Sequence, residues 1–260
     1  MEKVWMIASG KGGTGKTTLA ASLGVAFAKQ GKKVCVVDAC AGLKGVDLLL
    51  GMENRVVYDA FDVARQDCTL EQALIAHETY PNLFLLSTSQ IETADSMKPR
   101  QLEHIIKKLT KRFDIVLIDC PSGTEEGVMC AAEAADACIL TITPDDAALR
   151  AAEKLSAMLF EKSKMQMYLA VNGVNEKMIS EGLMMQPQQF SMVLDAPLIG
   201  ELPAGDGVYR ATLQHKTPLE TGEKHYTAQV LLMVSRMQDE DAAFKTYRVR
   251  RRKWFHHAEG

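Results

Sequence analysis

The sequence predicts an α/β protein with a doubly wound, mostly parallel sheet and helices on both faces. Two observations predict this class. Short runs rich in valine and isoleucine alternate with longer segments of helical periodicity, and the first of these runs leads directly into a glycine-rich loop. Because no repeat, low-complexity tract or linker interrupts the pattern, residues 1–240 are expected to form one domain, followed by a tail at 241–260.

Seven apolar runs are expected to be the strands. The segment 15–32 between the first two has helical spacing and ends near Gly31, and a last helix is expected near 223–238. The expected strands lie at residues 3–9, 32–38, 82–87, 113–119, 137–143, 167–172 and 196–202.

Composition favours an ordinary globular protein. Apolar residues make up 47% and charged residues 24%, and a net charge of −3 indicates no particular partner. The six cysteines lack C-x-x-C spacing and no apolar h-region follows the N-terminus, which argues against a disulfide scaffold, a zinc site and secretion and favours the cytoplasm. No run approaches the roughly 18 apolar residues of a spanning helix, so membrane contact is expected only at the surface.

The loop after the first strand has the complete phosphate-loop pattern G-x-x-x-x-G-K-[ST]. Its glycines allow the backbone to wrap around an anion, and the following helix presents free N–H groups to phosphate. Lys16 is expected to reach the β- and γ-phosphates as a catalytic cation, and the Thr17 hydroxyl to bind Mg²⁺. The residues expected to bind ATP or ADP are Gly10, Gly12, Gly13, Thr14, Gly15, Lys16, Thr17 and Thr18.

Two aspartates end neighbouring apolar runs. Asp38 closes "KKVCVVD" and Asp119 closes "FDIVLID", and strand ends of this kind meet at one edge of a parallel sheet. Phosphate-loop NTPases hold their metal through a strand-terminal aspartate, so Asp119 is expected to join Thr17 as a Mg²⁺ ligand.

The loop contains a second lysine, Lys11, that the phosphate-loop pattern does not require. "KGGTGKTT" resembles the deviant Walker A motif of the MinD/ParA family of ATPases, and the likeness continues to about residue 216 through "GLKGVDLLLGMENRVVYD", "IDCPSGTEEG", "LAVNGV" and "IGELPAGDGVYRA". The stretch "GLKGVDLLLGMENRVVYD" favours the MinD branch over the DNA-partitioning ParA branch.

This resemblance implies an ATP-dependent homodimer that acts with cell-division regulator proteins. Lys11 would cross the interface to the phosphates bound by the other subunit, where charge develops during phosphoryl transfer. The catalytic residues would then be Lys11, Lys16 and Asp38, and the adenine base would lie against Asn172 and Pro203.

One position departs from the family pattern. After the second strand the family has D-x-D, whereas this chain has Asp38, Ala39 and Cys40. A neutral thiol accepts hydrogen bonds poorly and does not simply replace the carboxylate that positions the attacking water. Two hypotheses remain, a weak Mg²⁺-dependent ATPase, which we favour, and a nucleotide-gated scaffold with little hydrolysis. A redox-active Cys40 is disfavoured because bound phosphate opposes a thiolate.

The tail carries six cations between residues 245 and 253. On a helix, Phe244, Tyr247, Trp254 and Phe255 would share one apolar arc, a pattern typical of segments that bind an anionic membrane surface. MinD proteins likewise end in a short membrane-targeting helix, so we expect peripheral association with the inner face of the cell membrane. A disordered tail and nucleic-acid binding are the alternatives.

Two other protein classes remain as alternatives. A ParA-type partitioning ATPase would bind DNA through a basic surface. A metal-delivery ATPase of the iron–sulfur carrier kind is disfavoured by the missing C-x-x-C pair.

Overall fold

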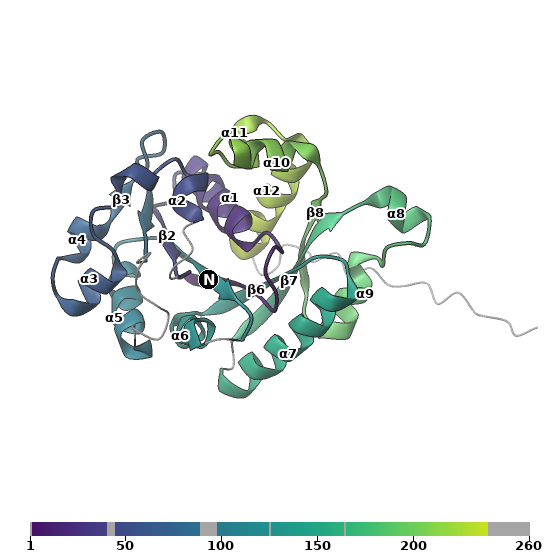
Figure 1. Cartoon of the computed structure of the whole chain (residues 1–260), viewed down its shortest axis with the longest axis horizontal. Helices are drawn as coiled ribbons and strands as arrows, with labels where there is room; N and C mark the ends of the chain where they lie inside the picture. Colours follow the sequence, from purple (N-terminus) through teal and green to yellow (C-terminus); the bar gives the residue numbers. More distant parts are fainter. Residues whose placement is uncertain (1, 41–44, 89–97, 125, 164, 239–260) are drawn as a thin grey trace, which may run out of the picture.

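The computed structural model describes residues 2–40, 45–88, 98–124, 126–163 and 165–238. Within them, eight strands form a single sheet in the order β3-β4-β2-β5-β1-β6-β7-β8 (Figure 1). The expected tail at 241–260 lies outside the described residues. The strands are β1 (Val4–Ser9), β2 (Val34–Asp38), β3 (Ile75–Ala76), β4 (Leu83–Leu86), β5 (Ile115–Ser122), β6 (Ala137–Ile142), β7 (Gln166–Val174) and β8 (Leu198–Pro203).

All seven expected strands are confirmed, and every pairing among them is parallel. The remaining strand, β3, has two residues and pairs antiparallel with β4 at one edge of the sheet. The sequence analysis did not predict β3, because two residues are too few to establish an alternating pattern.

The helices connect these strands. The expected helices at 15–32 and 223–238 correspond to α1 and α12. The helices are α1 (Lys16–Lys29), α2 (Val46–Leu49), α3 (Ala60–Arg65), α4 (Leu70–Ala73), α5 (Pro99–Leu109), α6 (Glu126–Ala134), α7 (Asp146–Lys162), α8 (Glu176–Ser180), α9 (Pro187–Leu194), α10 (Asp206–Leu213), α11 (Pro218–Thr221) and α12 (Lys224–Gln238), with a 3₁₀ turn at Glu53–Arg55.

Two apolar layers hold the helices against the sheet. Along β1, Trp5 and Ile7 point into a core built with α1, α2, α11 and α12, whereas Met6 and Ala8 point into a core built with α3 to α7 and α9. Figure 1 shows α1 and α12 on one side of the sheet and α6 and α7 on the other. Alternate residues of a strand face opposite sides, so β1 is buried on both faces.

The strand order brings the chemically important strand ends together. β1 lies between β5 and β6 at the centre of the sheet, and β2 pairs with the other edge of β5. In this register Asp38 lies directly beside Asp119. The loop from β1 to α1 begins at the same edge, which is where parallel α/β sheets bind ligands.

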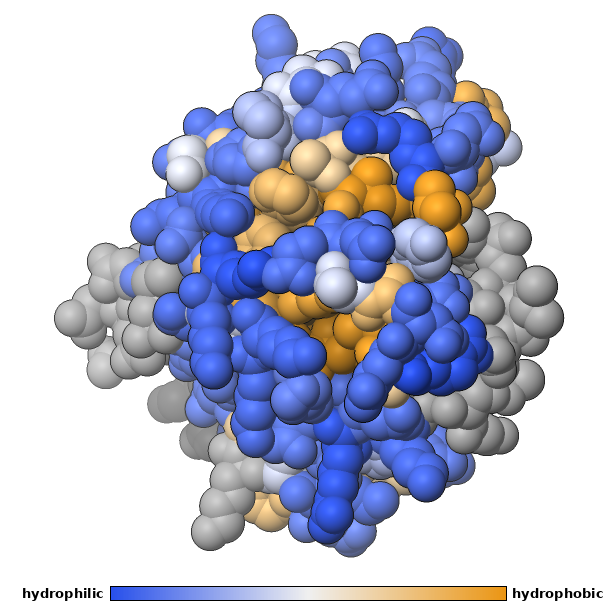
Figure 2. Space-filling model, turned by 90° about the vertical axis from the view of Figure 1, so that its left-hand side faces the viewer, coloured by the Kyte–Doolittle hydropathy of each residue, from blue (hydrophilic) through white to orange (hydrophobic). Residues whose placement is uncertain are grey.

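The face that carries α3, α4 and α5 is largely hydrophilic around a central apolar area (Figure 2). These helices also border a groove of about 680 Å³. Val63, Cys68 and Leu70 contribute to its wall, and it is flanked by the basic side chains Lys108, Lys111 and Arg112.

Candidate functional site

The glycine-rich loop joins β1 to α1 in a conformation that only glycine adopts without strain at two points. Gly13 has φ 76° and Gly15 has φ 88°, both in the left-handed region. A Cβ atom at Gly15 would lie 2.2 Å from the side-chain nitrogen of Asn172, and one at Gly10 would lie 2.1 Å from the backbone carbonyl oxygen of Ala151 in α7. Neighbouring elements therefore fix the shape of this loop.

A buried lysine lies beneath the loop. Lys16 is 7% exposed, and its Nζ donates a hydrogen bond to Ser9 Oγ at 2.9 Å. Ser9 Oγ in turn donates to the backbone carbonyl of Lys11 at 2.6 Å. Together these bonds hold the ammonium group at the N-terminus of α1, where the helix dipole also favours an anion.

The other loop residues named by the sequence analysis lie around this lysine. Gly12 is near the Ser122 hydroxyl, since a Cβ there would lie 3.7 Å from it. Thr17 and Thr18 are in the first turn of α1. The Thr14 side chain is buried, and its hydroxyl has no hydrogen-bond partner among the described residues.

Two buried carboxylates lie next to the first turn of α1. Asp38 and Asp119 are 2% and 1% exposed, and the Thr17 hydroxyl donates a hydrogen bond to Asp119. Burial raises the pKa of both groups, and the Asp119 charge raises the pKa of Asp38 further. The bond from Thr17 and the nearby charge of Lys16 oppose the shift at Asp119.

This arrangement fits a divalent cation. Asp119 Oδ1 is buried and has no hydrogen-bond partner in the part of the chain that the structure describes. A buried polar atom of this kind requires an explanation, and a metal ion supplies one. Carboxylate and hydroxyl oxygens are the ligands that Mg²⁺ prefers, so Thr17 and Asp119 are suitable first ligands.

Cys40 lies beside these carboxylates. Its backbone N–H donates to Asp38 Oδ1 at 3.0 Å, and its sulfur lies 3.8 Å from the backbone carbonyl oxygen of Asp119. Burial raises the pKa of the Cys40 thiol, and the charges of Asp119 and Asp38 add to this effect. The thiol is therefore neutral at pH 7.

Lys11 forms an ion pair within its own chain. Its Nζ lies 3.1 Å from Oδ1 and 3.2 Å from Oδ2 of Asp145, and both side chains are partly exposed. Asp145 also accepts a bond from the Thr143 hydroxyl and caps α7 through the Ala148 N–H at 2.9 Å. The hydrogen bond from Thr143 is the largest effect and lowers the pKa of Asp145; burial opposes it, and the bonds from Ala148 and Lys11 lower the pKa further.

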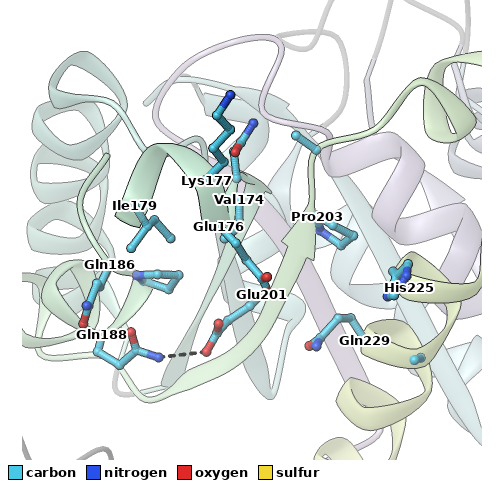
Figure 3. Close-up of a pocket in the computed structure, with 14 residues that line it drawn as sticks. Val174, Glu176, Lys177, Ile179, Gln186, Gln188, Glu201, Pro203, His225 and Gln229 are labelled. Atoms are coloured by element: carbon cyan, nitrogen blue, oxygen red, sulfur yellow. Dashed lines mark hydrogen bonds between the residues drawn. The ribbon is translucent and has the colours of Figure 1, made fainter. Parts of the chain in front are cut away.

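Asn172 and Pro203 lie on the other side of the loop. Asn172 Nδ2 donates to the backbone carbonyl of Thr14 at 2.9 Å, so this side chain fastens β7 to the phosphate loop. Pro203 ends β8 and lines a groove of about 720 Å³ together with Val174. Figure 3 shows Glu201 of β8 within this groove, hydrogen-bonded to Gln188, with Gln229 and His225 of α12 opposite.

The structure thus gathers the loop, Lys16, Asp38, Cys40 and Asp119 at one edge of the sheet. The sequence analysis missed Asp145 as the partner of Lys11. The segment "TPDD" does follow a predicted strand and precedes a helix, and an aspartate there is typical of an N-cap. Nothing in the sequence, however, relates that cap to a lysine 134 positions earlier.

Comparison with known proteins gives matches over most of the chain. Residues 2–171 match the family model described as "AAA domain". The septum site-determining protein MinD of Synechocystis is 37% identical over 86% of this chain and 84% of that protein. Among solved structures, the MinC:MinD complex of Aquifex aeolicus is 29% identical with a TM-score of 0.84, covering 91% of this chain and 95% of that one. MinD of Pyrococcus horikoshii, solved with Mg-ADP, is 28% identical with a TM-score of 0.80, covering 95% of this chain and all of the other.

Three features define a P-loop NTPase: a parallel sheet with a phosphate loop after its central strand, a buried lysine beneath that loop, and an aspartate on the neighbouring strand. The relatives specify this class further. The chain belongs to the MinD family of septum site-determining proteins, which are ATPases.

Proposed function

We propose that this chain is a nucleotide-controlled dimerisation switch that acts in placing the cell-division site. ATP binding joins two copies, and each Lys11 leaves Asp145 to contact the phosphates bound by the other copy. The observation that carries this proposal is the position of Lys11, a partly exposed cation beside the phosphate loop whose single-chain partner is a surface carboxylate. Exposed ion pairs contribute only about 0–1 kcal/mol, so the exchange of partners costs little.

The same proposal gives the site residues their roles. Lys16 and the loop N–H groups bind the phosphates, and Thr17 and Asp119 hold Mg²⁺. When bound, Mg²⁺ neutralises phosphate charge and orients the terminal phosphate. Asp38 and the backbone of the segment "IDCPSGTEEG" position water, and hydrolysis is slow because Cys40 supplies a thiol in place of a carboxylate. Asn172 and Pro203 border the adenine base.

The dimer acts at a membrane surface. Among the described residues, no helix combines the length and apolar character that crossing a bilayer requires. Residues 241–260 supply cations and aromatic side chains for an anionic surface, and two copies in a dimer strengthen a contact that is weak for one. One relative was solved as a MinC:MinD complex, which supports a cell-division regulator as a further partner.

The oligomeric state tests the central claim. Light scattering with size exclusion should give a dimer with ATP and magnesium, a monomer with ADP, and a monomer in both cases for Lys11→Ala. Lys107→Ala is the matched control, because Lys107 is also an ion-paired surface lysine but lies on α5. A wild-type chain that stays monomeric at saturating ATP refutes the proposal.

Lipid and DNA binding separate this function from plasmid or chromosome partitioning. Anionic vesicles should pellet the chain with ATP but not with ADP, and removal of residues 241–260 should abolish pelleting while leaving dimerisation intact. ATP-dependent retention on DNA without retention on vesicles would instead identify a ParA-type partitioning ATPase.

A further inference from the structure

Three side chains with metal-binding atoms meet at the ends of β2 and β5. A carboxylate oxygen of Asp38, the sulfur of Cys40 and a carboxylate oxygen of Asp119 all lie within 4.8 Å of one another. The cluster is formed by strand pairing, because Asp38 and Asp119 are direct neighbours in the β2–β5 register and Cys40 follows two residues later. Both aspartates are buried and Cys40 is partly buried.

A second observation indicates that this cluster lacks a ligand for one of its buried oxygens. Asp119 Oδ1 is buried without a hydrogen-bond partner among the described residues, although Thr17 donates a bond to the same carboxylate. The backbone N–H of Cys40 donates to Asp38, and among the described residues the Cys40 sulfur has only a weak contact, to the Asp119 carbonyl. Two potential ligand atoms, Asp119 Oδ1 and the Cys40 sulfur, therefore have little or nothing to bind among the described residues.

The sulfur changes which cation suits this space. Mg²⁺ prefers six oxygen ligands in octahedral geometry and binds sulfur poorly. Zn²⁺ and Cd²⁺ accept a thiolate together with carboxylates, at about 2.3 Å for zinc–sulfur and roughly 2.0–2.2 Å for zinc–oxygen bonds. Four-coordinate ligands at these distances lie roughly 3.5 Å apart, so the three side chains need to approach one another by about 1 Å.

We propose that Asp38, Cys40 and Asp119 form a binding site for a thiophilic divalent cation of the zinc class in the nucleotide-free chain. Binding breaks the sulfur–hydrogen bond of Cys40, releases that proton to solvent, and forms one metal–sulfur bond. Thr17 or water completes the coordination. The site lies where the proposed function assigns Mg²⁺, but it does not require ATP or dimerisation.

Cadmium titration of the full, nucleotide-free chain tests this site. Cd²⁺ should bind one ion per chain with a thiolate-to-metal charge-transfer band in the ultraviolet, and calorimetry should give a far higher affinity than for Mg²⁺. Cys40→Ser should lose the band and at least about 100-fold in affinity, since loss even of outer-shell partners weakens metal binding by about 10- to 100-fold.

Cys68→Ser is the matched control. Cys68 is also a partly exposed thiol near carboxylates, those of Asp59, Asp62 and Asp67, but it lies at the groove bordered by α3, α4 and α5. The band should persist in this variant. A band that survives in Cys40→Ser, or one that disappears in Cys68→Ser, overturns the assignment.

A measurement on the wild-type chain covers the case in which Cys40→Ser fails to fold. Cd²⁺ should protect Cys40, but not Cys68, from alkylation as mapped by peptide mass spectrometry. Equal alkylation of Cys40 with and without Cd²⁺ overturns the proposal. These readouts use neither ATP nor dimerisation, so this site and the dimerisation switch can fail independently.

Discussion

Cys40 stands where the family pattern D-x-D leads us to expect an aspartate. Burial raises the pKa of its thiol and the charges of Asp119 and Asp38 add to this, so the thiol is neutral and accepts a hydrogen bond from water poorly. In contrast, Lys16 bonds Ser9 and Thr17 bonds Asp119, so these side chains are held beside the phosphate loop. We therefore expect Cys40 to affect hydrolysis rather than nucleotide binding.

Restoring a carboxylate at Cys40 should accelerate hydrolysis. For Cys40→Asp we expect a rise of roughly 10²- to 10⁴-fold in the single-turnover rate with ATP and magnesium, the usual effect of one positioned catalytic group. Rapid-quench measurements on both proteins check this. Cys68→Asp should leave the rate unchanged. Equal rates for the wild type and Cys40→Asp would show that the thiol does not limit hydrolysis.

Gly15 should tolerate no side chain. Gly15→Ala places a Cβ 2.2 Å from the Asn172 amide at a φ of 88°, so the loop must move. We expect the free energy of unfolding to fall by about 1–2 kcal/mol, because alanine is strained in the left-handed backbone region, and urea unfolding measures this. We also expect nucleotide binding to be lost, which titration with fluorescent ADP measures. Gly31→Ala is the control, because Gly31 has φ 81° with no atom near its Cβ position. It should lose similar stability yet bind ADP normally.

At the scale of elements, α7 connects the loop to the rest of the molecule. Its backbone packs against Gly10, and its N-cap, Asp145, holds Lys11. The start of one helix thus positions both the loop and the lysine proposed to act across the dimer. A change in α7 is therefore transmitted directly to Lys11.

Removing the α7 cap should destabilise the chain. Asp145→Ala loses the bond to the Ala148 N–H and the pair with Lys11, and we expect a decrease of about 0.5–2 kcal/mol in the free energy of unfolding. Urea titration measures it. Asp146→Ala removes the next carboxylate, which makes no cap bond, and should change stability much less. Equal losses in the two variants would contradict the role of Asp145.

At the scale of the whole molecule, the stability of the fold depends on pH through His77, which directly follows the edge strand β3. His77 is buried, and its Nδ1 accepts bonds from the backbone N–H groups of Thr79 and Tyr80 at 3.1 and 3.2 Å. Burial lowers the pKa of His77 more than the nearby carboxylates of Glu220 and Glu78 raise it. Protonating Nδ1 would break both bonds, so the fold favours neutral His77.

Acidification should therefore weaken the fold through His77. The pKa of His77 in the folded chain lies below that in the unfolded chain. The contribution of His77 to the free energy of unfolding is therefore complete above about pH 6.5. It decreases as the pH falls toward the folded pKa, by at most about 1.4 kcal/mol per pH unit. Urea unfolding from pH 7.5 to 5 should show a smaller pH dependence for His77→Gln than for the wild type. His104→Gln, at an exposed site on α5, should behave like the wild type. Parallel curves for wild type and His77→Gln would refute this link.

The local sequence was sufficient for much of this protein. Apolar periodicity predicts seven strands and the first and last helices, and glycine spacing predicts the phosphate loop. Each of these depends on residues within one short segment. The two residues of β3 were missed because their pairing with β4 depends on a partner elsewhere in the chain. The assignments at 241–260 remain predictions.

The sequence by itself determined the fold class, the phosphate loop and the carboxylates at strand ends, since local pattern and side-chain chemistry suffice for these. Only the tertiary structure decided which distant groups meet. The pairing of β2 with β5 puts Cys40 among two buried aspartates, and the packing of α7 gives Lys11 its partner Asp145. Contacts of this kind depend on strand order and helix packing, which arise from burying the whole apolar surface at once and are encoded in no single segment.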